Sequence, residues 1–178
     1  MFHKKNYYFF GVLAALATVT IWAAFLIGTR FAVSGNLTVD EVLLLRLVPA
    51  FLIMLPFMLK LGVIIQGQSI FSLLMIALGA TAVFPYLIST GVYYAPASDA
   101  GALAPGMLPF WTALFAFFIT GEKPSKIRAL GLIIILLGAF VVGSYSILSS
   151  NGQDTWKGHF LFLAGSGMWS IYSVYFRQ

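Results

Sequence analysis

The sequence predicts an all-α fold, a polytopic bundle of six transmembrane helices with its N-terminus inside the cell. Two observations predict this fold. First, 61% of the 178 residues are hydrophobic and only 8% are charged, whereas a soluble domain has about 45–50% apolar and about 25% charged residues. Second, the apolar residues form long blocks separated by short polar joints. A soluble fold would leave too much apolar surface in water, so we expect the lipid bilayer to cover it.

Six apolar blocks approach or reach the roughly 17 to 25 residues that a spanning helix needs. They cover residues 7–31, 42–59, 70–94, 100–120, 127–147 and 158–176. The joints between them carry turn residues, as in segments 34–36, 66–68 and 149–152. Residues 4–17 also resemble a secretory signal peptide. The apolar block continues well beyond residue 17, however, which favours a retained spanning helix.

Three of these helices have recognisable start signals. Thr38 and Glu41 have the spacing of a capping box, which places a helix start at Thr38. Ser98 or Asp99 is expected to cap the fourth helix, and Ser125 the fifth, because these side chains accept hydrogen bonds from the first free backbone N–H groups.

The basic residues predict the orientation of the bundle. With the N-terminus inside, only Arg30 and Lys157 face outside, while Arg46 lies within a span. Seven basic residues then face the cytoplasm, namely Lys4, Lys5, Lys60, Lys123, Lys126, Arg128 and Arg177. This is a strong positive-inside bias, and six spans also place the C-terminus inside. The net charge of +5 is therefore interpreted as a topology signal, and no nucleic-acid partner is expected.

The first and sixth blocks resemble each other at an offset of 147 residues. The matched pairs are Gly11 with Gly158, Leu16 with Leu163, Ala17 with Ala164, Trp22 with Trp169 and Arg30 with Arg177. The repeat unit would then hold five spans, and an odd number inverts the second copy in the membrane. We expect a first five-helix repeat over 7–147, an outer linker over 148–157 and the first helix of an incomplete second repeat over 158–178.

Several segments of the chain carry motifs that can be compared with those of known membrane proteins. The first helix has Trp22 and, later, Arg30, and the second has Arg46 in the run 42–47. The fourth helix has Pro109 and Trp111 in the run 108–114 and ends at residues 121–122, a Gly-Glu pair. A fifth helix with glycines at 131 and 138 follows. With these motifs the chain resembles the EamA-type family of the drug/metabolite transporter superfamily, and the run 158–177 is similar to the start of that family's second repeat.

The resemblance implies a ten-helix permease or exporter of small metabolites, amino acids or drugs, in the plasma (inner) membrane of a bacterium. Inverted repeats imply alternating access to a site near the midplane. We expect the chain to be truncated after the first helix of the second repeat, so a second copy or a separately encoded second half would complete it. The alternative is a non-transporting membrane protein, or the nonfunctional fragment of a disrupted transporter gene.

Arg46 is the basic residue placed deepest within a span. An intramembrane charge is by default a functional hypothesis, so Arg46 is a candidate for the substrate pathway. Two structural alternatives remain open. The side chain could extend along the helix to the outer surface, or it could pair with Asp99, which is also predicted near the outer face.

Five aromatic residues lie away from the predicted helix ends and are further candidates for the pathway: Trp22, Tyr86, Trp111, Trp169 and Tyr172. Polar aromatic tips need hydrogen-bond partners at such depth, and a solvated cavity supplies them. Packing between helices is the alternative for each residue.

Pro109 is a candidate because it interrupts the fourth helix near the midplane. Pro105 and Pro109 each lack a backbone donor, which leaves the carbonyls of Gly101 and Pro105 without their usual partners. Glu122 and Asp99 are candidate gate charges. Their structural alternatives are a loop charge cluster for Glu122 and a helix cap for Asp99.

Other chemistries find no support in the sequence. The two histidines, His3 and His159, have no ligand-spaced companions, so no metal site is expected. No activated nucleophile and no phosphate-binding loop are present, and we expect neither an enzyme nor a cofactor. Energy would come from an ion gradient or from the substrate's own gradient.

Overall fold

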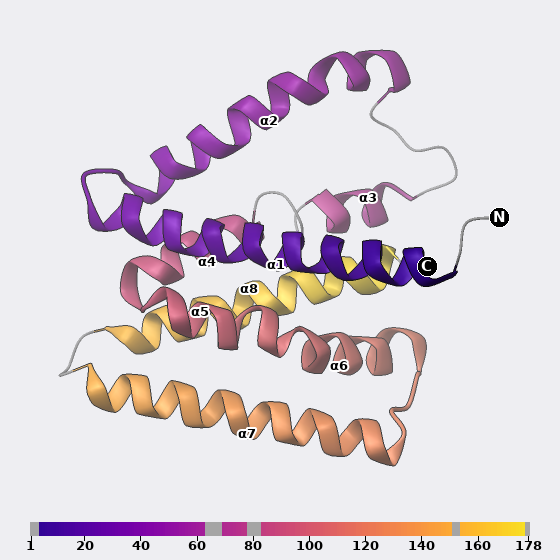
Figure 1. Cartoon of the computed structure of the whole chain (residues 1–178), viewed down its shortest axis with the longest axis vertical. Coiled ribbons are helices and arrows are strands. Elements are labelled where there is room, and N and C mark those ends of the chain that lie inside the picture. The colour runs from indigo at the N-terminus through magenta and orange to yellow at the C-terminus, as the bar shows by residue number, and fades with distance from the viewer. Residues whose placement is uncertain (1–3, 63–68, 78–82, 151–153, 177–178) are drawn as a thin grey trace.

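The computed structural model describes residues 4–62, 69–77, 83–150 and 154–176. The described residues form helices and no strand (Figure 1). The helices are α1 (Lys4–Ser34), α2 (Val39–Leu61), α3 (Ile70–Ala77), α4 (Val83–Tyr94), α5 (Ala97–Leu103), the 3-10 helix η2 (Pro105–Met107), α6 (Leu108–Thr120), α7 (Lys126–Ser149) and α8 (Thr155–Phe176). The predicted all-α fold is confirmed.

Four segments of the described chain are long and apolar enough to cross a membrane. They are Tyr8–Ser34, Val39–Leu61, Ala97–Thr120 and Lys126–Ser149. The count of six spans stays a prediction, because neither the third nor the sixth predicted span is among these four. The third is divided between α3 and α4, with residues 78–82 outside the described part, and the sixth corresponds to α8. Arg177, one partner in the proposed repeat, also lies outside it.

Local sequence sets the starts of α2 and α7 as predicted. The Glu41 backbone N–H donates to Thr38 Oγ1 at 3.3 Å, and the Thr38 N–H donates to Glu41 Oε2 at 2.8 Å, which completes the capping box. Ser125 Oγ accepts from the Arg128 N–H at 3.3 Å. Each bond satisfies a backbone donor that the helix itself leaves free.

The predicted cap of the fourth span is wrong. The helix α5 begins at Ala97 with Pro96 as its N-cap, and no side chain caps it. Asp99 lies within the first turn, and its carboxylate bonds to side chains of other helices instead. The long-range partners outcompete the local backbone because the carboxylate is buried among them.

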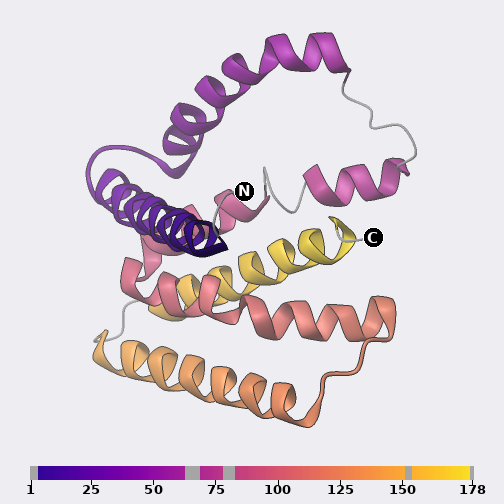
Figure 2. The same cartoon turned by 45° about the vertical axis from the view of Figure 1, so that its right-hand side comes forward.

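The helices run back and forth between two ends of the molecule (Figures 1 and 2). The start of α1 and the end of α8 lie at the same end of the molecule. The helix α8 occupies the interior and packs most extensively against α4 and then against α6. The helices α2 and α7 lie on opposite outer sides.

Two glycines allow α4 and α8 to approach closely. A Cβ added to Gly158 would lie 2.5 Å from Ala95 Cβ and 2.7 Å from the Gly91 carbonyl oxygen. A Cβ added to Gly91 would lie 2.4 Å from the Phe162 ring. Small residues at a contact of this kind let helix backbones approach inside a membrane. The contact fixes α8 in the interior, where its next turns reach the candidate sites.

Candidate functional site

Four helices contribute side chains to an aromatic cavity of about 230 Å³. It is lined by Ile21, Trp22 and Phe25 of α1, Arg46 of α2, Phe84 of α4 and Trp169 of α8. We call this the aromatic cavity. Its rings contact one another in several orientations. The centroid of Trp169 lies 4.7 Å from that of Phe84 and 5.7 Å from that of Trp22, and the latter pair is edge to face.

Helix periodicity explains why Trp22 and Phe25 both reach the aromatic cavity. Trp22 and Phe25 are three residues apart and therefore share a face of α1. The guanidinium of Arg46 lies 4.1 Å from the centroid of the Phe25 ring. A cation over an aromatic face is attracted by the ring quadrupole. Arg46 therefore presents its charge at the wall of the cavity, and the alternative pairing with Asp99 is not formed, because that carboxylate is occupied elsewhere.

The remaining predicted aromatic residues divide into two groups. Tyr172 contacts Trp169, with ring centroids 5.3 Å apart, and extends the aromatic row along α8. Tyr86 is 48% exposed and does not line the aromatic cavity. Trp111 stacks on Phe115 at 5.8 Å, outside the aromatic cavity, and its indole N–H is buried without a partner among the described residues.

Pro105 and Pro109 divide the fourth predicted span into α5, η2 and α6. Pro109 itself is exposed, at the start of α6. The Leu108 N–H donates to the Pro105 carbonyl, in the shorter pattern of a 3-10 turn. This leaves the Ala104 carbonyl without its usual helical donor. Ser166 of α8, which is fully buried, supplies one: its hydroxyl donates to that carbonyl at 2.7 Å. The interruption is therefore satisfied by the neighbouring helix.

Replacing Ser166 with alanine is expected to lower the free energy of unfolding by about 1 kcal/mol, because the buried Ala104 carbonyl loses its donor. Ser173→Ala is the matched control. Its hydroxyl bonds to the Trp169 carbonyl within α8, which keeps a backbone donor. Unfolding of the two variants by sodium dodecyl sulfate in mixed micelles checks this. Equal midpoints for both variants would contradict the assignment.

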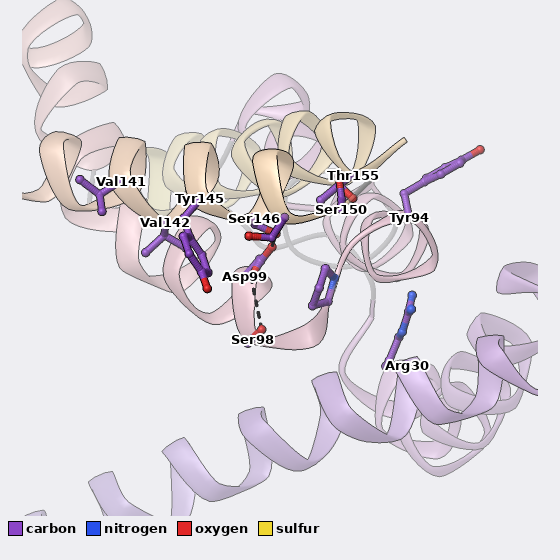
Figure 3. A pocket seen from close by; sticks show the side chains of 12 residues that line it. Arg30, Tyr94, Ser98, Asp99, Val141, Val142, Tyr145, Ser146, Ser150 and Thr155 are labelled. Carbon is purple, nitrogen blue, oxygen red and sulfur yellow. Dashed lines mark hydrogen bonds between the residues drawn. The ribbon is translucent and has the colours of Figure 1, made fainter. Parts of the chain in front are cut away.

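A second polar site, the Asp99 cluster, joins α5, α7 and α8. The carboxylate of Asp99 is 6% exposed. Its Oδ1 accepts from the Ser98 hydroxyl at 3.2 Å, and its Oδ2 accepts from the Ser146 hydroxyl and lies 2.8 Å from His159 Nε2. Figure 3 shows Asp99 directed towards Ser146 of α7. The four residues, Ser98, Asp99, Ser146 and His159, define the cluster.

The Asp99 cluster borders a cavity of about 490 Å³ that is separate from the aromatic cavity. Arg30 of α1 lies on the opposite wall (Figure 3). Its guanidinium donates to the carbonyls of Val92 and of Tyr93, the latter at 2.9 Å, in the last turn of α4. A cation at this position stabilises the negative end of the helix dipole. Arg30 is thus engaged with the α4 backbone.

The contacts of His159 and Ser146 are not predicted from the sequence. In the sequence, His159 is singled out only as a possible metal ligand, without a ligand-spaced companion. A signal was available, because Asp99 and His159 are both predicted at the outer ends of apolar spans, where each is the simplest partner for the other. Across the described residues, no three His, Cys, Asp or Glu side chains come together as a metal site.

Glu122 lies apart from both cavities. It is exposed and follows Gly121, whose left-handed conformation (φ 73°) ends α6. Within the described part of the chain, Glu122 makes no ion pair. The structure therefore does not bring the two predicted gate charges, Asp99 and Glu122, together.

Comparison with known proteins identifies one relationship. The family model described as the EamA-like transporter family matches residues 9–144. The matched segment covers most of α1 to α7 and includes Trp22, Arg46, Phe84 and Asp99. No curated protein and no solved structure matches the chain.

Proposed function

Because the chain belongs to the EamA-like transporter family, we propose that it carries a small organic molecule across the membrane with the aromatic cavity as its binding site. The chain is a multi-pass membrane protein, and its family is one of transporters. The observation that carries the proposal is the meeting of Trp22, Phe84 and Trp169 beside the charge of Arg46. Binding sites of small molecules combine apolar walls with a few placed polar groups.

The lining of the aromatic cavity favours a carboxylate attached to an apolar or aromatic body. Arg46 is the charged residue among the six lining residues, and none of these six is acidic. A guanidinium binds a carboxylate through two parallel hydrogen bonds. The rings of Trp22, Phe84 and Trp169 favour an aromatic body through edge-to-face or offset contacts. Aromatic amino acids have both features.

The proposed transport cycle is alternating access between two halves. The first repeat covers 7–147, the linker 148–157, and the start of the second repeat 158–178. The contact between Trp22 and Trp169, which the proposed repeat pairs, supports a site at the interface of the repeats. A second copy of the chain or a separately encoded second half would supply further helices. The proposed location is the plasma membrane of a bacterium.

Tryptophan fluorescence tests the binding site directly. The chain has four tryptophans, and two of them line the aromatic cavity. In lipid vesicles, phenylalanine is expected to change the emission, and Trp22→Phe or Trp169→Phe is expected to remove much of that change. Trp156→Phe is the control, because Trp156 is 56% exposed at the start of α8. An equal response in all three variants would contradict this site.

Uptake into vesicles tests transport itself. Radiolabelled phenylalanine is expected to enter vesicles that contain the chain faster than protein-free vesicles. Phenylalaninol, which has the same ring and amine but no carboxylate, is expected to show no such increase. Absence of phenylalanine uptake, with the chain inserted and helical, would favour a non-transporting membrane protein.

A further inference from the structure

We propose that the Asp99 cluster is a proton-binding site, and that it couples a proton to the transport described above. The coupling rests on the proposed function, whereas proton binding does not. The cluster is a carboxylate and an imidazole, each 6% exposed, held between α5, α7 and α8. A buried ionisable pair in a membrane transporter is by default a functional hypothesis, with proton relays among the roles such pairs perform.

In the proposed site the Asp99 carboxylate is taken as ionised. An ionised carboxylate only accepts hydrogen bonds, so the proton of the 2.8 Å contact then belongs to His159 Nε2 and is directed at Asp99 Oδ2. The second nitrogen, Nδ1, is buried and has no partner among the described residues. In the neutral imidazole this atom holds a lone pair. It is therefore the atom that receives the added proton.

Proton uptake at Nδ1 changes the charge of the pair. A proton from water forms an N–H bond at Nδ1, no bond to carbon breaks, and nothing is oxidised or reduced. The net charge of Asp99 and His159 changes from minus one to zero. Nδ1 lies 3.7 Å from where a Cβ of Gly143 would stand, so α7 faces it with a glycine. Asp99 lines the nearby cavity of about 490 Å³, which is the proposed route for water to the cluster.

The described elements packed around the Asp99 cluster contribute few other charged or titratable side chains. Arg30 of α1, Tyr94 of α4 and Tyr145 of α7 line the same cavity. Arg30 is engaged with the α4 carbonyls, and Lys157 of α8 pairs with Asp154 at 2.7 Å. The segments η2 and α6 contain no titratable side chain. Among the described residues, His159 is therefore the titratable group in contact with the Asp99 carboxylate, and the two form an ion pair when the imidazole is protonated.

Because the cluster joins three helices, its charge can bias their arrangement. The carboxylate bonds to Ser146 of α7 and to His159 of α8 at the same oxygen. With the imidazole neutral, the buried site carries an uncompensated negative charge. With the imidazole protonated, the two charges compensate each other and stabilise the contact between α5 and α8. If the closed state of the transporter requires this contact, the transporter takes up one proton to close and releases it when it opens. It would then move one proton in each transport cycle.

Nitrogen NMR of the full chain in lipid nanodiscs tests proton binding without any transport. A His3→Gln background leaves His159 as the remaining histidine. We expect the neutral imidazole to be the Nε2–H tautomer, and Nδ1 to gain a proton as the pH is lowered while the chain stays folded. Asp99→Asn is expected to remove the fixed tautomer. A mixed or Nδ1–H tautomer, or no protonation of Nδ1 before the chain unfolds, would overturn the proposal.

A transport assay tests the coupling separately. A gradient of one pH unit is expected to drive up to about tenfold accumulation of phenylalanine if one proton is coupled. His159→Gln is expected to abolish this accumulation but keep exchange of labelled for unlabelled phenylalanine. Full accumulation in His159→Gln would overturn the coupling. If the unsubstituted chain shows no exchange, the proposed function fails, and the NMR result alone decides the proton site.

Discussion

Replacing Gly158 with valine is expected to disrupt the packing of α8 against α4. A Cβ at this position would lie 2.5 Å from Ala95 Cβ, 2.7 Å from the Gly91 carbonyl oxygen and 3.0 Å from the Ala95 backbone nitrogen. Two of these three atoms are backbone, so no side-chain rotation relieves the overlap. The helices would have to separate, which removes contacts along the whole of α4 and α8. We expect the free energy of unfolding to fall by about 3 kcal/mol or more.

Gly138→Val is the matched control for this substitution. Gly138 is also within a helix, α7, but a Cβ there meets nothing within 4 Å. The two variants lose the same backbone freedom and gain the same side chain. Unfolding in mixed micelles, followed by circular dichroism, should therefore separate them clearly. Equal stabilities would show that α8 does not pack on α4 through Gly158.

Small residues in a sequence show where a helix can be approached, but not which helix approaches it. Gly131 and Gly138 would permit close packing on α7, yet a Cβ at either position meets no other atom within 4 Å in the described chain. The closely packed pair is instead Gly91 and Gly158. The information that decides between them is the rotation of each helix about its axis, and that rotation depends on residues far away in the sequence.

Local signals were predicted more reliably than distant contacts. The caps at Thr38 and Ser125 depend on residues three positions away, and both are formed. The cap expected from Ser98 or Asp99 failed because Ser146 and His159, 47 and 60 residues from Asp99, bind its carboxylate. A single sequence does not show such distant partners directly. They can be found only by testing which of the buried ionisable residues could pair with each other.

The candidate site also combines features that the sequence predicts with features that it does not. Trp22, Arg46 and Trp169 are candidates because they lie deep within predicted helices, and all three line the aromatic cavity. Depth also suggested Tyr86 and Trp111, which face elsewhere. The chain has 17 phenylalanines, so nothing in the sequence singled out Phe25 and Phe84. The depth of a residue in the membrane can be estimated by counting residues along its helix. The direction in which its side chain points depends on the tertiary packing of that helix.

Replacing Arg46 with glutamine is expected to weaken phenylalanine binding by roughly thirtyfold, equivalent to about 2 kcal/mol, because a charge-assisted hydrogen bond to the carboxylate is lost. Glutamine keeps polarity and approximate length, so the aromatic cavity should retain its shape. Tryptophan emission measured against phenylalanine concentration gives the change in dissociation constant. Arg128→Gln is the matched control, because that arginine is exposed at the start of α7, away from the aromatic cavity.

Two further measurements separate the charge of Arg46 from its packing over Phe25. Arg46→Lys keeps the charge but loses the planar fork and the stacking on the ring, so binding should recover only in part. Phenylalaninol has no carboxylate, so its weak binding should not fall further in Arg46→Gln. An equal loss of affinity for both ligands would mean that Arg46 acts by supporting Phe25. In that case the aromatic rings, and not the guanidinium, would select the substrate.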